Sequence, residues 1–153
     1  MSLYIVLLVA GIIIDQLVKW WTVAQVMLGQ NISIIPNVLA IDHVNNYGAA
    51  YNILNNKRWL FYIITIIAVI IFSYLLLKGK ERRPLFLTSI TLLLAGTIGN
   101  AIDRVFRGHV VDMIAINLFN LPFLNFVCNI ADILITSGVI LLIVYLLKDE
   151  QKK

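Results

Sequence analysis

The chain of 153 residues has few charges: 13% of its residues are Asp, Glu, Lys or Arg, whereas 61% are hydrophobic. A soluble domain has about 25% charged and about 45–50% apolar residues, so this composition excludes a soluble globule and a disordered tail. Metal-binding residues are also scarce. Cys128 is the single cysteine, and His43 and His109 are the two histidines. This set excludes an intramolecular disulfide and a thiolate cluster and has no zinc spacing, so we expect neither a metal nor another cofactor.

The hydrophobic residues are gathered into long runs. A helix needs about 20 mostly apolar residues to cross a bilayer, and four segments meet that need: residues 3–21, 59–77, 85–102 and 127–147. We predict an all-α membrane protein with four transmembrane helices, built as one integral membrane domain over residues 1–153. The first helix is expected to be retained, because Met1 and Ser2 give no basic segment of the kind that opens a cleaved signal peptide.

Two connections between the predicted spans are long, residues 22–58 and 103–126, and both lie at the same end of the bundle. The first has β-branched residues around a Pro-Asn turn, which predicts short strands. The second is apolar and broken by Asn-Leu-Pro, which predicts an extended piece packed on protein or at the membrane interface. We therefore expect a small β-rich region beside the helices, at the membrane surface.

Charge indicates which side of the membrane each end occupies. Seven basic residues lie at the end with the termini and the short turn 78–84, and five lie at the end with the long connections. Because the cytoplasmic side collects Lys and Arg, we predict cytoplasmic termini and extracytoplasmic long connections. The net charge of +4 in so apolar a chain favours contact with anionic membrane lipids over nucleic acid.

The acidic residues carry the main functional signal. Five of the eight lie at the end with the long connections: Asp15, Asp42, Asp103, Asp112 and Asp132. An aspartate at the centre of a membrane helix costs roughly 2.5–3.5 kcal/mol on insertion scales, so such residues are rare and are usually paired or functional.

Asparagines precede two of these aspartates. Asn100 lies three residues before Asp103, and Asn129 lies three residues before Asp132. Residues three apart share a helix face, so we expect each asparagine amide to donate to the aspartate that follows it.

Two further charge pairs have helical spacing. Arg104 adjoins Asp103, and Lys19 follows Asp15 by four residues, so we expect an ion pair in each case. A purely structural role, in which these four residues lock helix ends together, is as plausible as a functional one.

Two carboxylates close together can perform acid and base chemistry without another cofactor. Both cannot easily ionise, so one activates a water molecule while the other, protonated, polarises a carbonyl group. A serine triad is disfavoured, because neither histidine has a Gly-x-Ser-x-Gly elbow near it. These residues favour the chemistry of an aspartic protease.

Five motifs resemble those of bacterial lipoprotein signal peptidase, also called signal peptidase II. They occur in order along essentially the whole chain: DQLVK (Asp15 to Lys19), NYGAAY (Asn46 to Tyr51), GNAIDR (Gly99 to Arg104), VVDM (Val110 to Met113) and CNIAD (Cys128 to Asp132). Four residues of these motifs depart from the family's usual Thr or Phe: Tyr47, Tyr51, Met113 and Cys128. They lie beside the polar residues of the motifs, so we expect them to change the shape of the pocket more than the catalysis.

The resemblance implies an aspartyl endopeptidase of the bacterial cytoplasmic membrane. Enzymes of this family remove the signal peptide from diacylglyceryl-modified prolipoproteins, cutting just before the lipidated cysteine. By the same resemblance Asp112 and Asp132 are catalytic, and the partners are the prolipoprotein and membrane lipids, with the enzyme a monomer. Further residues are expected to bind substrate or support the site: Asp15, Asn46, Gly48, Asn100, Asp103, Arg104 and Asn129. The run from Gly48 to Ala50 is expected to close over the peptide.

Two other classes of protein fit an aspartate-bearing membrane bundle. A small carrier of protons or cations also places aspartates in membrane helices, but here the acids gather at one end, and the second span has no ionisable residue except tyrosine. A membrane adaptor without enzymatic activity gives no reason for two Asn-x-x-Asp pairs.

Overall fold

The computed structural model describes residues 1–48, 58–117 and 125–150. The elements in chain order are α1 (Ser2–Gln25), β1 (Asn31–Ile35), β2 (Leu39–Asn46), α2 (Arg58–Leu77), α3 (Pro84–Phe106), β3 (Val110–Ile116), β4 (Phe126–Cys128) and α4 (Ile130–Glu150). Within these described residues four helices are long and apolar enough to cross a membrane, which confirms that part of the prediction. A helix satisfies all of its backbone hydrogen bonds within itself, as a spanning segment must.

The helices extend beyond the apolar runs from which they were predicted. α1 continues to Gln25 and α3 continues to Phe106, so Asp103 and Arg104 lie in a helix and not in the connection that follows it. α4 begins only at Ile130, because residues 126–128 form strand β4. Pro84 starts α3 at the position where its missing N–H has no cost. Polar residues can extend α1 and α3 because other side chains of the protein form ion pairs and hydrogen bonds with them, as described below.

The strands form one antiparallel sheet in the order β1-β2-β3-β4. Its first hairpin turns at Pro36-Asn37, where Asn37 has a φ of 59°, a conformation that asparagine tolerates better than most residues. The strands predicted in the first long connection are thus confirmed. In the second long connection, for which only an extended piece was predicted, the structure adds β3 and β4.

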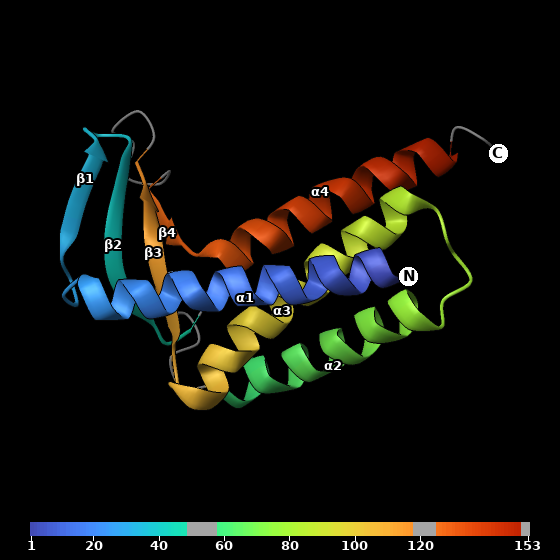
Figure 1. The fold of residues 1–153 in the computed structure, drawn as a ribbon, viewed down its shortest axis with the longest axis horizontal. Coiled ribbons are helices and arrows are strands. Elements are labelled where there is room, and N and C mark those ends of the chain that lie inside the picture. Colours follow the sequence, from blue (N-terminus) through green and yellow to red (C-terminus); the bar gives the residue numbers. More distant parts are fainter. Residues whose placement is uncertain (49–57, 118–124, 151–153) are drawn as a thin grey trace.

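α3 is the central helix, packing against each of the other three (Figure 1). α3 approaches α4 closely because glycines of α3 face α4. At Gly96 an added Cβ would lie only 2.3 Å from the carbonyl oxygen of Ala131, so a larger residue would not fit. An apolar cluster between the helices includes the buried Leu87, Ile90 and Leu93 of α3. Small residues of α3 therefore allow the close approach of α4.

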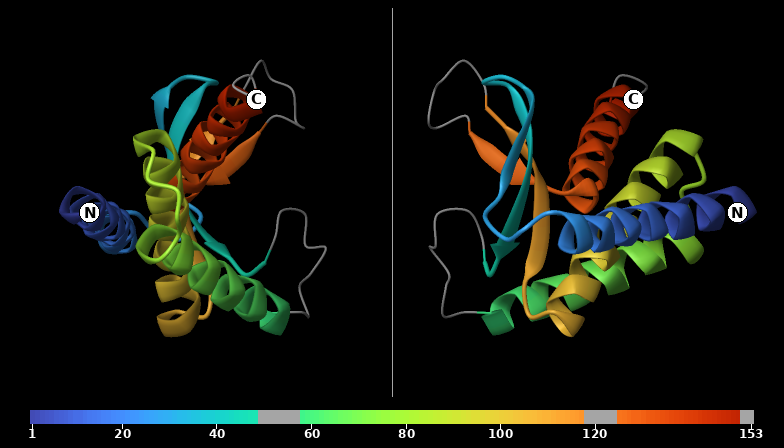
Figure 2. Two further views of the ribbon diagram at one scale, coloured as in Figure 1. Left: turned by 90° about the vertical axis from the view of Figure 1, so that its right-hand side faces the viewer. Right: turned by 60° about the vertical axis from the view of Figure 1, so that its left-hand side comes forward.

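The sheet stands across one end of the helices (Figures 1 and 2). The start of α1, the α2–α3 connection and the end of α4 lie at the opposite end (Figure 1). There Arg83 donates hydrogen bonds to Glu81, Asp149 and the hydroxyl of Tyr145, which ties the start of α3 to the end of α4. The polar residues near the sheet are therefore separated from these partly exposed charges by the length of the bundle.

Candidate active site

Asp112 lies in the middle of β3 and is almost fully buried. Its neighbour β2 has an irregularity between Ile41 and Val44, where one extra residue shifts the register against β3. After this shift Val44 is opposite Asp112, so Asn46, two residues further along, lies on the same face as Asp112. The side-chain amide of Asn46 donates to Oδ2 of Asp112 at 2.9 Å.

Asp132 lies in the first turn of α4, where Asn129 immediately precedes the helix. The Asp132 N–H donates to Oδ1 of Asn129 at 2.9 Å, and the Asn129 N–H donates to Oδ2 of Asp132 at 3.2 Å. This reciprocal pair is a capping box, which satisfies two N–H groups that a helix start leaves without partners. It also holds the Asp132 carboxylate at the positive end of the helix dipole.

The asparagine side chains donate to carboxylates on other elements, which corrects the pairing expected from their spacing. Asn129 donates from Nδ2 to Oδ1 of Asp112 at 2.6 Å, and Asn100 donates from Nδ2 to Oδ1 of Asp132 at 2.8 Å. Spacing along a helix predicts a shared face, but a better partner on a neighbouring element can take the hydrogen bond. Asp112 and Asp132 are consequently linked through a single residue, Asn129.

The environment of Asp112 favours its protonated form. Burial raises the pKa of this carboxyl group to about 6, with a further upward contribution from the negative charge of Asp132. The amides of Asn46 and Asn129 act in the opposite direction, because they stabilise the carboxylate, but burial dominates. Asp112 can therefore keep its proton to a higher pH than an exposed aspartate does.

A cluster of buried charges lies behind the two acids. The Lys19 ammonium lies 2.9 Å from Oδ2 of Asp15 and 3.2 Å from Oδ2 of Asp103, and all three side chains are fully buried. The expected Asp15–Lys19 pair is thus confirmed. Asp15 also accepts the N–H of Ala131 at the start of α4, and Asp103 accepts the N–H of Val111 on β3. The cluster therefore joins α1 and α3 to the elements that carry Asp132 and Asp112.

The expected ion pair between Asp103 and Arg104 is not the one that forms. Asp103 pairs with Lys19 and with Arg107, the residue that directly follows α3. Consecutive helix residues point in different directions, whereas residues four apart lie on one face, so the later arginine has the better geometry. Gln16 completes the cluster by donating to Oδ2 of Asp15 and to the carbonyl of Gly99.

Sequence reasoning missed three members of this cluster as site residues: Gln16, Lys19 and Arg107. Spacing gave a signal for two of them, since Lys19 follows Asp15 by four residues and Arg107 follows Asp103 by four. Nothing in the sequence distinguished Gln16.

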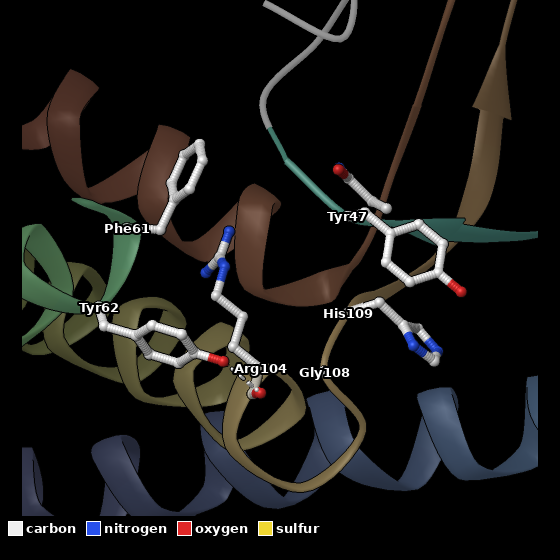
Figure 3. A pocket seen from close by; sticks show the side chains of 7 residues that line it. Tyr47, Phe61, Tyr62, Arg104, Gly108 and His109 are labelled. Atoms are coloured by element: carbon white, nitrogen blue, oxygen red, sulfur yellow. Dashed lines mark hydrogen bonds between the residues drawn. The ribbon is translucent and has the colours of Figure 1, made fainter. Parts of the chain in front are cut away.

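An open pocket, about 240 Å³ when the open solvent at its mouth is included, lies next to Asn46 and Arg104 (Figure 3). The Arg104 side chain extends into it with its guanidinium carbon 5.4 Å from the centre of the Phe61 ring, and the Tyr62 hydroxyl donates to the Arg104 carbonyl. Across the pocket the rings of Tyr47 and His109 are 5.2 Å apart. Arg104 donates within the protein to the carbonyl of Asn100, at the long distance of 3.4 Å. A guanidinium with five donors therefore faces a space that a ligand can occupy.

The remaining predicted residues lie as follows. Gly48 follows β2 and donates its N–H to Oδ1 of Asn46 at 3.1 Å, which orients the Asn46 amide toward Asp112. Ala49 and Ala50, predicted to close over a peptide with Gly48, lie outside the described residues. Asp42 accepts a hydrogen bond from Asn31 of β1 and takes no part in the site.

The surroundings of Cys128 disfavour a nucleophilic role, although it adjoins Asn129. Burial raises the pKa of its thiol to about 11, with upward contributions from Asp132 and Asp112. The thiolate needed for nucleophilic attack is therefore scarce at neutral pH.

Comparisons with known proteins give relatives that match along nearly the whole chain. The family model described as signal peptidase (SPase) II matches residues 7–148. The lipoprotein signal peptidase of Lactiplantibacillus plantarum is 42% identical over 152 residues, covering 98% of this chain and 97% of the relative. That of Lactococcus lactis is 38% identical over 151 residues, covering 99% and 97%.

Two solved structures, each described as a bacterial membrane enzyme, share the fold. One has a TM-score of 0.91 at 39% identity and covers 100% of this chain and 92% of its own. The other has a TM-score of 0.85 at 41% identity and covers 97% and 95%. The resemblance to signal peptidase II is thereby confirmed. Because the family model matches residues 7–148 and the relatives match over nearly their full length, the chain belongs to the signal peptidase II family.

Proposed function

We propose that this membrane protein is an aspartyl endopeptidase that removes signal peptides from diacylglyceryl-modified prolipoproteins, with Asp112 and Asp132 as its catalytic pair. The observation that carries the proposal is that these two acids, twenty residues apart in the chain, are linked through Asn129. Each also receives an amide hydrogen bond from another asparagine, Asn46 or Asn100.

The pair works as a unit that holds one proton. The ionised carboxylate takes a proton from a water molecule as that water attacks the scissile carbonyl carbon. The protonated carboxyl group polarises the carbonyl oxygen and then supplies the proton that the departing amine needs. The raised pKa of Asp112 supports this scheme, because it keeps the shared proton available near neutral pH.

Arg104 and its pocket are suited to hold the substrate backbone. A guanidinium donates to carbonyl oxygens, and the aromatic rings of Phe61 and Tyr62 offer apolar walls around it. The acyl chains of the substrate remain in the bilayer beside the helices, whose outward faces are apolar, as at Ile66 and Ile70 of α2. The peptide thus reaches the site from the side.

We place the sheet and the catalytic pair at the extracytoplasmic face of the bacterial cytoplasmic membrane, with both termini in the cytoplasm. Basic residues are more numerous at the far end of the bundle. Of those near the sheet, Lys19 is fully buried between two carboxylates and Arg107 is paired with Asp103, so neither is free to contact lipid head groups.

A carrier of protons or cations is less well supported. Asp15, Asp103 and Asp132 all lie near the sheet, and residues 59–77 include no Asp, Glu, Lys, Arg or His. A relay across the bilayer needs ionisable groups along its length.

Cleavage of a diacylglyceryl-modified prolipoprotein peptide by the purified protein in detergent tests the proposal. We expect cleavage before the modified cysteine, no cleavage of the unlipidated peptide, and no effect of a metal chelator. Asp112→Asn and Asp132→Asn should each lower the rate roughly 100- to 10,000-fold, as loss of a general acid or base does. Asp42→Asn, which changes an aspartate outside the site, is the matched control. A folded wild type that does not cut, or either site variant with near-normal turnover, contradicts the assignment.

A further inference from the structure

Lys19 uses all three protons of its ammonium group inside the protein. Two face the carboxylates of Asp15 and Asp103, and the third is donated to Oδ1 of Asn100 at 3.0 Å. The lysine side chain is 0% exposed and so cannot touch a substrate. Its contact with Asn100 nevertheless places it one residue away from Asp132.

This contact determines which way the Asn100 amide points. An amide has an accepting oxygen at one side and a donating nitrogen at the other, whereas an ammonium only donates and a carboxylate only accepts. With Oδ1 held by Lys19, Nδ2 faces Asp132, to which it donates at 2.8 Å. Without the ammonium, the amide can rotate and turn its oxygen toward the Asp132 carboxylate, which repels it.

We propose that Lys19 is a positioning residue for the cleavage reaction, acting through Asn100 to hold the Asp132 carboxylate in place. The inference rests on the proposed catalytic role of Asp132. It predicts that loss of the Lys19 ammonium lowers kcat and leaves KM unchanged, because the lysine acts on a catalytic group and not on substrate binding.

The competing explanation is that Lys19 only balances two buried negative charges. This charge-balancing role can be tested separately from the positioning role. Arg107 also pairs with Asp103, so the charge of Asp103 stays compensated when Lys19 is removed. The double variant Asp15→Asn with Lys19→Met removes one charge of each sign and leaves Asp103 paired with Arg107. The amide oxygen introduced at position 15 can still accept the N–H of Ala131, which Asp15 accepts at 2.8 Å. This variant removes the contact with Asn100 without leaving a buried charge uncompensated.

The experiment measures kcat and KM on the lipidated peptide, together with thermal unfolding in detergent, for Lys19→Met and for the double variant. We expect Lys19→Met to unfold at a lower temperature and the double variant to recover much of that loss. Both should have kcat reduced roughly 10- to 100-fold, the effect of losing one hydrogen bond to a charged group. Lys148→Met, at the exposed far end of α4, is the matched control and should cleave as wild type does.

A mutant cycle with Asn100→Ala gives a second readout. If Lys19 acts through Asn100, adding Lys19→Met to Asn100→Ala should change kcat by less than about twofold, since interacting residues are not additive. The proposal is overturned if the double variant with Asp15→Asn has wild-type kcat, or if Lys19→Met costs as much in the Asn100→Ala background as alone. Failure of the proposed function is a separate result, because in the same assay the wild type would then not cut, or Asp132→Asn would retain activity.

Discussion

Asn129 donates its side-chain amide to Asp112 on β3, 2.6 Å away, and not to Asp132 three residues further along the chain. Its side-chain oxygen and backbone N–H serve Asp132 through the capping box. One neutral residue, completely buried, therefore contacts both acids of the proposed pair. The separation of the two carboxylates depends on this residue and on the docking of β3 against the start of α4.

Asn129→Ser and Asn129→Ala separate the capping role from the contact with Asp112. Serine caps a helix about as well as asparagine, whereas alanine costs about 1 kcal/mol. We expect Asn129→Ser to keep most of the wild-type thermal stability and Asn129→Ala to lose it. Both should reduce kcat roughly 10-fold or more, because neither side chain replaces the amide donor to Asp112. Full activity in Asn129→Ser would show that the donor is dispensable.

Asp112 makes stability depend on pH. Its pKa rises from 3.8 to about 6 on folding, so the folded state holds the proton more tightly than the unfolded state does. The stabilisation is complete below pH 3.8 and is lost as the pH rises through about 6. The loss amounts to as much as about 3 kcal/mol.

Asp112→Asn removes this titration. We expect wild-type stability to fall between pH 4 and pH 7 relative to that of Asp112→Asn, as measured by thermal unfolding in detergent. Asp42→Asn should retain the wild-type pH dependence, because Asp42 lies outside the buried pair. Parallel curves for the wild type and Asp112→Asn would contradict the prediction.

Gly99 keeps space for the buried charge cluster. A Cβ added at this position would lie 2.6 Å from Oδ2 of Asp15 and 3.3 Å from the Cβ of Ala131. Gly99→Ala should therefore destabilise the protein by about 1–3 kcal/mol through overpacking, although alanine normally favours a helix by about 1 kcal/mol.

Gly11→Ala is the matched control for Gly99→Ala. The nearest atoms to its added Cβ belong to side chains, at 3.2 and 3.3 Å, which can move by a few tenths of an ångström. Thermal unfolding of the two variants should show the larger loss at Gly99. An equal or smaller loss there would mean that Asp15 can move without cost.

Spacing along one helix predicted the Asp15–Lys19 pair correctly, because residues four apart on α1 face the same neighbour. The same reasoning paired Asp103 with Arg104, whereas the structure pairs it with Lys19 and Arg107. Local spacing identifies which residues share a face. It does not reveal which partner a neighbouring helix brings to that face.

The sequence by itself determined the four apolar helices, the polar end of the bundle and the identities of the acids and amides, because hydropathy and motif order are properties of the chain alone. The tertiary structure decided which amide serves which carboxylate. The register shift in β2 brings Asn46 onto the face of Asp112, and the packing of α1 against α3 brings Lys19 to Asn100. These contacts join residues 66 and 81 positions apart. Hydrogen bonds are short and directional, so only the packed elements select these partners.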